Sequence, residues 1–367
     1  MKILHVIGTM GMGGAQSLLV ELAPVQKKMG CDVTVLQLKN PKDDTLAKKL
    51  MAEGINVEIL NPTRPEKSIM NIFSLIPYLK KHDIVHVHLF PAQYWVALAK
   101  LISFSKVPIV TTEHSTTNKR RNSRIFKYID TFIYKCYKEV VACSDKAKET
   151  FLQRYRGINA VSIPNGVNIE KYTKAIPYSK KELLGIDEET FVTTMVARFA
   201  YPKRQDVLVE ALSKLSDNHH AVFVGGKEND EGLLKVKKLS EDLGVAERVH
   251  FLYSRPDVPR ILKSSDAVLM SSEYEGLSLS SIEGMACGHP FIATNVNGLR
   301  EVVSGAGLLV ECGNADDLAT VLNRLATDDV HYNKTVERCL ERASEFDITT
   351  VAEMYMEEYR KFSNKFK

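Results

Sequence analysis

Residues 266–290 read DAVLMSSEYEGLSLSSIEGMACGHP, and this stretch decides the fold expected for the chain. The apolar run AVLM predicts a buried strand. Gly276 then permits a tight turn, and Ser278 is a good N-terminal cap for the helix that follows. Glu275 precedes this helix, and Glu283 lies about five residues inside it, roughly 7.5 Å along the axis. Strand, Gly turn and helix in this order are typical of a βαβ unit.

The two glutamates therefore flank a helix N-terminus, whose free backbone amides favour phosphate oxygens. A carboxylate accepts hydrogen bonds from both hydroxyls of a vicinal diol. Diol, diphosphate and diol follow one another in a nucleotide sugar, as sugar ring, pyrophosphate and ribose. A solvated helix face is the plainer interpretation, but the Gly-Met-Ala-Cys-Gly run after Glu283 suits a packed helix better than a wet one.

Short apolar runs alternate with longer helical patterns along the whole chain, which predicts parallel, doubly wound α/β sheets. A length of 367 residues predicts two domains. Ile163-Pro-Asn-Gly-Val marks the boundary, and the stretch from there to Gly185 reads as a linker. The predicted strands are Lys2–Ile7, Asp32–Leu38, Val57–Leu60, Ile84–His88, Ile109–Thr112, Val140–Ala142, Ala160–Ile163, Thr193–Val196, Ala221–Val224, Val249–Leu252, Ala267–Met270, Pro290–Thr294 and Gly307–Val310.

The composition is that of a globular cytoplasmic protein. No apolar run reaches the ~18–20 residues of a membrane span. The first ten residues, MKILHVIGTM, are too short for a signal peptide and read as a first buried strand. The six cysteines are scattered without a Cys-x-x-Cys pair, which favours a reducing compartment over disulfides or a zinc site.

The net charge of +4 is unevenly distributed. Residues 1–173 carry 25 Lys and Arg against 14 Asp and Glu, a net charge of +11, and the remainder carries 24 against 31, a net charge of −7. A basic first half suggests an anionic partner, such as a phospholipid surface or a phosphate-bearing acceptor, and solubility alone is the equal alternative.

The segment 118–138 interleaves Lys and Arg with aromatic and aliphatic residues at helical spacing. Two interpretations stay open: a helix lying on an anionic membrane surface, or an amphipathic core helix with a wet basic face. Nucleic acid is not an expected partner, because no recognised binding module accompanies the charge.

Two loops carry candidate phosphate chemistry. Gly13 and Gly14 open a helix after the first strand, so its amides suit phosphate, but Gln16 stands where a dinucleotide fingerprint needs Gly. This disfavours a nicotinamide-dependent dehydrogenase. Arg198 and Lys203 follow another buried strand and can clamp a diphosphate, stabilising the charge that grows on a leaving group. A solvated loop is the alternative for either segment taken alone.

The histidines are weaker signals. His114 follows a strand of the first domain and is a candidate substrate contact, with a structural role as the alternative. His86 and His88 alternate along a strand and so share a face. A metal site would need a third ligand, and packing or an acceptor-side role is the favoured interpretation. The chain has no Asp-x-Asp motif to hold a divalent ion on a diphosphate, so neither a metal nor a cofactor is expected.

Together these segments resemble the family 4 retaining glycosyltransferases, which have the GT-B fold of two Rossmann-like domains facing across a cleft. The resemblance spans nearly the whole chain. Asn297 departs from the first Gly of the family's Gly-Gly-x-x-Glu loop, and Ser278 stands where Pro is frequent. The matches are Gly13-Gly14 with the first-loop glycines, Arg198 and Lys203 with the Arg-x4-Lys pair, and Glu275 and Glu283 with the Glu-x7-Glu element.

The resemblance implies a metal-independent, retaining hexosyltransferase. It would move a sugar from a nucleotide-diphosphate donor, most commonly a UDP-sugar, to a glycan or polyprenyl-lipid-linked acceptor in cell-envelope or exopolysaccharide biosynthesis. It implies an acceptor-binding domain over residues 1–170, completed by a C-terminal helix at about 349–367, and a donor-binding domain over residues 171–348. A cytoplasmic protein, peripheral on the inner face of the membrane, fits these partners.

The resemblance also implies residue roles. The catalytic candidates are Arg198 and Lys203 on the diphosphate, Glu275 on hydroxyls of the transferred sugar, and His114 near that sugar. The donor-binding candidates are Gly13 and Gly14 closing on the diphosphate, Tyr253 near the base, Glu283 on the ribose, and Gly276, Leu277, Ser278 and Leu279 through backbone amides.

Two alternatives would use a similar site. A nucleotide-sugar epimerase of similar fold needs acid and base residues around the sugar and no acceptor. A non-catalytic sugar-nucleotide binder needs only the donor contacts, and the complete donor set argues against it.

Overall fold

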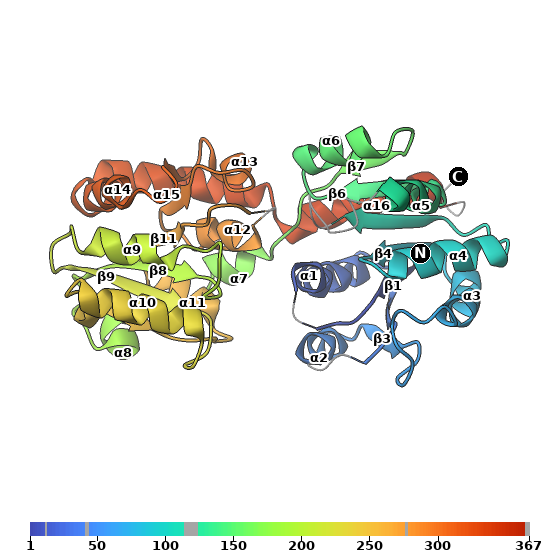
Figure 1. The fold of residues 1–367 in the computed structure, drawn as a ribbon, viewed down its shortest axis with the longest axis horizontal. Coiled ribbons are helices and arrows are strands. Elements are labelled where there is room, and N and C mark those ends of the chain that lie inside the picture. The colour runs from blue at the N-terminus through green and yellow to red at the C-terminus, as the bar shows by residue number, and fades with distance from the viewer. Residues whose placement is uncertain (12, 41–43, 114–123, 276–277, 364–367) are drawn as a thin grey trace. The chain divides into compact units, whose positions relative to one another are not determined.

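A computed structural model describes residues 1–11, 13–40, 44–113, 124–275 and 278–363. The chain forms two compact units, each with one parallel sheet covered by helices (Figure 1). Unit 1 comprises Met1–Gly166 with Ile348–Lys367, and unit 2 comprises Val167–Asp347. These limits lie four residues and one residue from the expected domain boundaries at 170 and 348.

Unit 1 contains a seven-stranded sheet in the order β3-β2-β1-β4-β5-β6-β7, with every pair parallel. Its strands are β1 (Lys2–Ile7), β2 (Asp32–Gln37), β3 (Asn56–Ile59), β4 (Ile84–His88), β5 (Ile109–Glu113), β6 (Glu139–Ala142) and β7 (Ala160–Ser162). Its helices are α1 (Gly14–Lys28), α2 (Thr45–Ala52), α3 (Asn71–Lys81), α4 (Ala92–Ile102), α5 (Arg124–Lys135), α6 (Asp145–Arg154) and α16 (Ile348–Phe362).

The sheet of unit 1 is buried on both faces, and successive residues of β1 show this. Ile3 and Ile7 belong to one apolar cluster, together with residues of α1, α2 and α16. Leu4 and Val6 belong to a second cluster, with residues of α3 and α4. Neighbouring residues of a strand point to opposite faces, so a strand with helices on both sides is apolar at nearly every position.

Unit 2 contains a six-stranded parallel sheet in the order β10-β9-β8-β11-β12-β13. Its strands are β8 (Phe191–Val196), β9 (His219–Val224), β10 (Val249–Phe251), β11 (Ala267–Met270), β12 (Phe291–Thr294) and β13 (Leu308–Val310). Its helices are α7 (Ile169–Thr173), α8 (Lys180–Leu184), α9 (Gln205–Leu212), α10 (Glu231–Asp242), the 3₁₀ helix η2 (Ala246–Arg248), α11 (Val258–Lys263), α12 (Leu279–Ala286), α13 (Arg300–Val303), α14 (Ala315–Thr327) and α15 (Asp329–Ser344).

Each of the thirteen predicted strands is present, with ends shifted by at most two residues. The predicted linker up to Gly185 is wrong, because this stretch forms α7 and α8 and packs into unit 2. Tyr172 is buried in the main core of that unit, and the Arg260 guanidinium lies 3.6 Å from the centre of the Tyr178 ring. Aromatic anchors at wide spacing fix this segment without producing a periodic apolar pattern.

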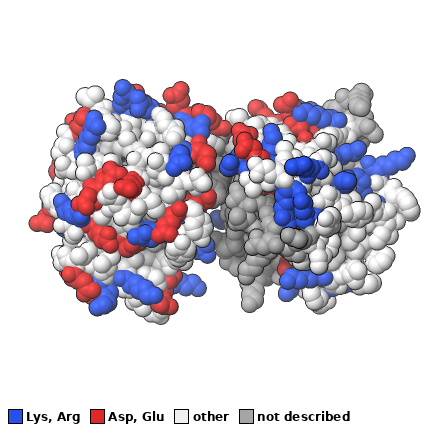
Figure 2. All heavy atoms as spheres, turned by 45° about the horizontal axis from the view of Figure 1, so that its top comes forward, with Lys and Arg blue, Asp and Glu red and all other residues white. Residues whose placement is uncertain are grey.

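The predicted C-terminal helix is present as α16, which packs against α1 within unit 1. Val351, Tyr355 and Tyr359 are fully buried there. Among the helices of the described ranges, none is both long and apolar enough to cross a bilayer. Basic side chains gather on the visible face of unit 1, whereas acidic ones are spread across that of unit 2 (Figure 2).

Candidate active site

The strand order of unit 2 reverses between β8 and β11. The chain moves outward from β8 through β9 to β10 on one side, and from β11 through β12 to β13 on the other. At such a switch point, ligands bind outside the carboxyl ends of the two central strands. The loop holding Arg198 and Lys203 leaves β8, and the loop holding Glu275 leaves β11. Three predicted site residues therefore meet at this edge of the sheet.

Lys203 and Glu275 are ion-paired, through Nζ and Oε1. The hydroxyl of Ser272 donates a second hydrogen bond to Oε1 of Glu275, at 2.7 Å. The Lys203 and Glu275 side chains are only 19% and 16% exposed. Water screens this ammonium weakly, so it would act strongly on any phosphate that reaches it.

Arg204 provides a second tie between the same two loops. Its Nη1 bonds Oε1 of Glu273 at 2.8 Å, and its Nε bonds both carboxylate oxygens of Asp206 at 2.9 and 3.0 Å. The Ser271 hydroxyl donates to the Arg204 carbonyl at 2.7 Å. Hydrogen bonds from Tyr201 and then Arg204 hold the pKa of the Glu273 carboxyl below its usual value. The contacts of Arg204 with Glu273 and Ser271 thus join the two loops that carry Lys203 and Glu275.

Helix α12 begins four residues after Glu275 in the sequence. Ser278 caps it as predicted, and its hydroxyl accepts a bond from the Ser281 amide at 3.3 Å. The first turn contains no acidic residue, so the dipole end stays open to an anion. Gly284 packs the helix tightly on the sheet, because a Cβ there would stand 2.5 Å from the Phe291 ring. Glu283 is half-buried, one residue before this contact.

The remaining loops at this edge are joined through their backbones. The Gly225 amide donates to the Tyr253 carbonyl at 2.8 Å, and a Cβ on Gly225 would stand 2.2 Å from the Ala197 carbonyl oxygen. Tyr253 has a positive φ of 51° and is 38% exposed. Arg198 is exposed, and its carbonyl accepts from the Gln205 side chain at 2.9 Å. Tyr253 and Arg198 therefore both present side chains that a ligand can reach.

The predicted first-loop glycines lie at the start of α1 in unit 1. Gly13 is the N-cap of this helix and offers no side-chain cap, and the first turn contains no acidic residue. No atom lies within 4 Å of a Cβ built on Gly14. The amides at this helix start are thus available to an anion. His114, Gly276 and Leu277 lie outside the described residues.

His86 and His88 share a face of β4, as predicted, and the parallel register with β1 places His5 beside both, with its ring centre 5.3 Å from each of theirs. All three are fully buried, and burial lowers the pKa of His5 to about 4. Their ring nitrogens lie close enough to suggest metal ligation, but both nitrogens of His5 and of His86 already have hydrogen-bond partners. These bonds join His5 to His88 (3.1 Å) and Gln26 (2.8 Å), and His86 to Thr112 (2.7 Å) and Tyr359 (2.5 Å). A role in packing fits this arrangement best.

The structure adds residues that the sequence did not mark as functional. The fold brings them together from two loops that are far apart in the sequence. Ser272 and Glu273 come from the loop after β11, and Arg204 comes from the loop after β8. Arg204 has a positive φ of 54°, which no local motif predicts. The pair Gly225-Gly226 after a strand was a detectable signal, since consecutive glycines at a strand end favour close backbone approach.

Comparison with known proteins identifies the family and the fold. Two family models match the chain. The model described as "Glycosyltransferase Family 4" matches residues 12–171, and the model described as "Glycosyl transferases group 1" matches residues 179–346. A relative from Escherichia coli, UDP-Gal:alpha-D-GlcNAc-diphosphoundecaprenol alpha-1,3-galactosyltransferase, is 30% identical over 291 residues, covering 74% of this chain and 73% of the relative. The chain belongs to glycosyltransferase family 4. This glycosyltransferase also resembles solved structures along nearly its whole length.

A glycosyltransferase from Rickettsia africae superposes with a TM-score of 0.86 at 25% identity, covering 99% of this chain and 98% of that one. The Anabaena protein HepE, crystallised with UDP, superposes with a TM-score of 0.85 at 23% identity, covering 98% and 100%. The predicted GT-B fold of this glycosyltransferase, with its two Rossmann-like parallel-sheet units, is confirmed.

Proposed function

We propose that this glycosyltransferase transfers a hexose from a UDP-sugar, with retention of anomeric configuration, to a lipid-linked or glycan acceptor in envelope polysaccharide synthesis. The observation that carries the proposal is the Lys203–Glu275 pair at the switch point of unit 2. The name of the Escherichia coli relative specifies a UDP-sugar and a diphosphoundecaprenol-linked acceptor, which supports both substrate classes.

The donor would lie along the carboxyl edge of unit 2. Its diphosphate would contact Lys203, Arg198 and the first amides of α12. Glu275 would accept hydrogen bonds from the transferred sugar and Glu283 from the ribose. The base would lie near Tyr253, which is exposed at the end of β10.

The proposed chemistry needs no protein nucleophile. The bond between the anomeric carbon and the donor phosphate oxygen breaks, and the acceptor oxygen bonds to the same face of that carbon. The departing phosphate oxygen takes the proton of the acceptor hydroxyl. Lys203, Arg198 and the helix amides neutralise the charge that grows on UDP, so the reaction is proposed to proceed without a metal ion.

Helix α5 supports a peripheral membrane location for the acceptor-binding unit. Asp130 and Tyr134 on its inner side are buried, but its outer side exposes Ile125 (72%), Tyr128 (77%) and Phe132 (56%). A core helix with a wet basic face would expose charge here instead. Exposed apolar side chains with lysines beside them suit an anionic bilayer surface. If the protein does not bind anionic vesicles at low salt, this location is wrong.

The activity is tested by incubating the protein with a panel of nucleotide sugars and measuring the nucleoside diphosphate released, with and without polyprenyl-diphosphate-linked acceptors. Release that requires an acceptor, lost in Lys203→Ala and kept in the exposed control Lys237→Ala, supports the proposal. An isomerised donor without acceptor would instead identify an epimerase. Donor binding without any product would identify a sugar-nucleotide binder.

A further inference from the structure

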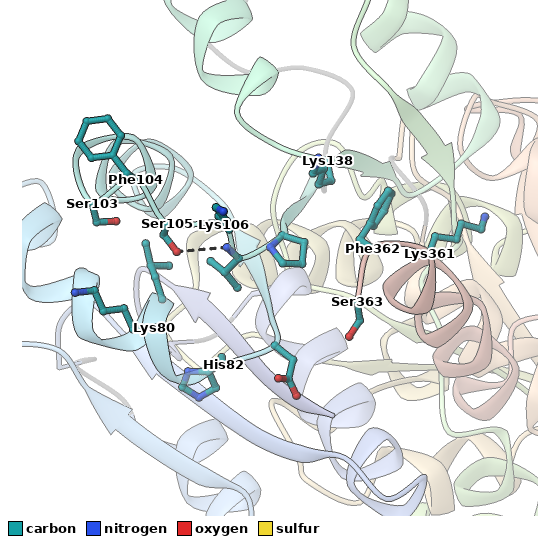
Figure 3. A pocket seen from close by; sticks show the side chains of 14 residues that line it. Lys80, His82, Ser103, Phe104, Ser105, Lys106, Lys138, Lys361, Phe362 and Ser363 are labelled. Carbon is teal, nitrogen blue, oxygen red and sulfur yellow. Dashed lines mark hydrogen bonds between the residues drawn. The ribbon is translucent and has the colours of Figure 1, made fainter. Parts of the chain in front are cut away.

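Unit 1 contains a hollow of about 690 Å³ at the amino edge of its parallel sheet. His82 and Asp83, which line it, precede β4, residues 103–108 precede β5, and Lys138 precedes β6. The end of α16 closes it with Lys361, Phe362 and Ser363 (Figure 3). All these segments lie at the amino ends of parallel strands, whereas catalytic ligands of such sheets bind at the carboxyl ends. The hollow therefore lies at the opposite edge of the unit 1 sheet from Gly13 and Gly14.

The hollow carries more positive charge than its acids neutralise. Lys361 is paired with Glu358 at 2.7 Å, but Lys80, Lys106 and Lys138 form no ion pair within the described part of the chain. The neighbouring Lys100 has its pKa lowered, first by burial and then by Lys138. Lysines from separate segments thus give this edge an excess of positive charge.

The acidic residues that line the hollow are fewer than its lysines. Asp83 is the single acidic residue among the lining residues described, and its Oδ2 accepts a bond from the Lys2 backbone amide at 2.7 Å. A bound anion would offset this excess of positive charge. Phosphate suits the arrangement, because lysine binds it as a point charge without demanding a fixed geometry.

An apolar rim adjoins these lysines. Phe104 is 90% exposed and has a positive φ of 50°, an uncommon conformation for an aromatic residue. Leu101 and Ile102, at the end of α4, are 42% and 49% exposed. In Figure 3 Phe104 lies beside Ser103, at the margin of the labelled side chains. Exposed apolar groups that gather in one place mark an interaction site more often than single ones do.

We propose that this hollow is a phosphate-binding site, whose ligand is the phosphate of an anionic phospholipid headgroup or of a soluble phosphoester. Lys106 and Lys138 hold the phosphate, with Lys80 at the margin. Phe104 and the end of α4 would contact the acyl region of a lipid. A soluble phosphoester has no acyl chains for these apolar side chains to contact. The apolar rim therefore predicts that the lipid binds more strongly.

The first experimental arm measures co-sedimentation with phosphatidylcholine vesicles containing phosphatidylglycerol, at low salt. The double variant Lys106→Ala/Lys138→Ala should lose about 25-fold in partition, or roughly fivefold for each lysine. The double variant Lys235→Ala/Lys237→Ala removes the same charge from exposed positions on α10 and should bind like the unchanged protein. Any contribution from α5 is common to all variants. Phe104→Asn, which tolerates the positive φ, should bind several-fold less.

The second arm measures inorganic pyrophosphate binding by calorimetry. Pyrophosphate held at the donor site is common to all variants, so only the difference between the two double variants reports on the hollow, and Phe104→Asn should not change it. If binding to vesicles depends on Lys106 and Lys138, the ligand is a lipid. If only pyrophosphate binding depends on these lysines, the ligand is a soluble phosphoester. If the two double variants, both folded by circular dichroism, behave alike in both arms, the site does not exist. Neither readout uses sugar transfer, so the proposed activity stands or falls separately.

Discussion

Removing the ammonium of Lys203 should slow the transfer step more than it weakens donor binding. Lys203 is positioned at the switch point by its ion pair with Glu275 and is only 19% exposed. At such a site, a charge 4 Å from a phosphate oxygen contributes about 4 kcal/mol at an effective dielectric constant of 20. The leaving UDP gains charge in the transition state, so part of this energy is realised only there.

We expect Lys203→Ala to lower kcat by about 10²–10³-fold, the loss typical of one donor to a developing oxyanion. The variant Lys203→Met keeps the packing of the side-chain stem and should show a similar loss. The assay is the initial rate of UDP release at saturating donor and acceptor, with circular dichroism to confirm folding. Full turnover of Lys203→Ala at saturating donor would refute the role of this residue in leaving-group departure.

A double-mutant cycle separates charge stabilisation from positioning. If Lys203 acts only by orienting Glu275, then Lys203→Met should cost nothing further in a Glu275→Gln background. If it stabilises the departing diphosphate, most of the loss in kcat should persist in that background. The second outcome is expected, because Ser272 still holds residue 275 through its hydroxyl.

Three further predictions concern other contacts. Glu283→Gln should raise the donor KM by about tenfold with little change in kcat, because its contact with the ribose is equally strong in the ground state and in the transition state. An unchanged KM would show that Glu283 does not contact the ribose. Gly284→Ala should destabilise the protein by about 1–3 kcal/mol in urea unfolding, because its Cβ would stand 2.5 Å from the Phe291 ring; a neutral effect would show that α12 can move. Burial and then a hydrogen bond with Glu358 raise the pKa of Glu139 to about 7, and its buried Oε2 lacks a partner unless the two carboxyls share a proton. The stability that this protonated pair contributes is complete below pH 4.5 and is lost as the pH rises through 7. Glu139→Gln should therefore flatten the decline in the unfolding midpoint between pH 5.5 and 8. An equal decline in the variant and the unchanged protein would contradict the shared proton.

The strands were predictable because their signals are local. A parallel strand with helices on both faces is apolar at nearly every position, so runs such as Ala267–Met270 stand out from the helices around them. The Ser278 cap was predictable for the same reason, since a cap acts within three residues of itself. The roles of Glu275 and Lys203 came from a family pattern, and their ion pair followed only from the neighbouring positions of β8 and β11.

Periodicity shows which residues share a face, but it does not show what covers that face. His86 and His88 were correctly placed together, yet His5 joined them only through the parallel pairing of β1 with β4. The apolar residues of α5 had two interpretations, and only the fold shows which of them face outward. The stretch containing Tyr172 was misread as a linker, because its packing depends on residues far away in the sequence.

The sequence by itself therefore determined the fold class and the order of the strands along the chain, and it supplied the residue types of the proposed nucleotide-sugar site. These features depend on interactions between residues within about ten positions of one another, or on the regular alternation of apolar strands and helices along the chain. Only the tertiary structure decided that Arg204 and Glu273 brace the donor loops, and that Lys80, Lys106 and Lys138 surround one hollow. Their side chains come from segments separated in the sequence, and their mutual distances are set by which strands and helices pack together.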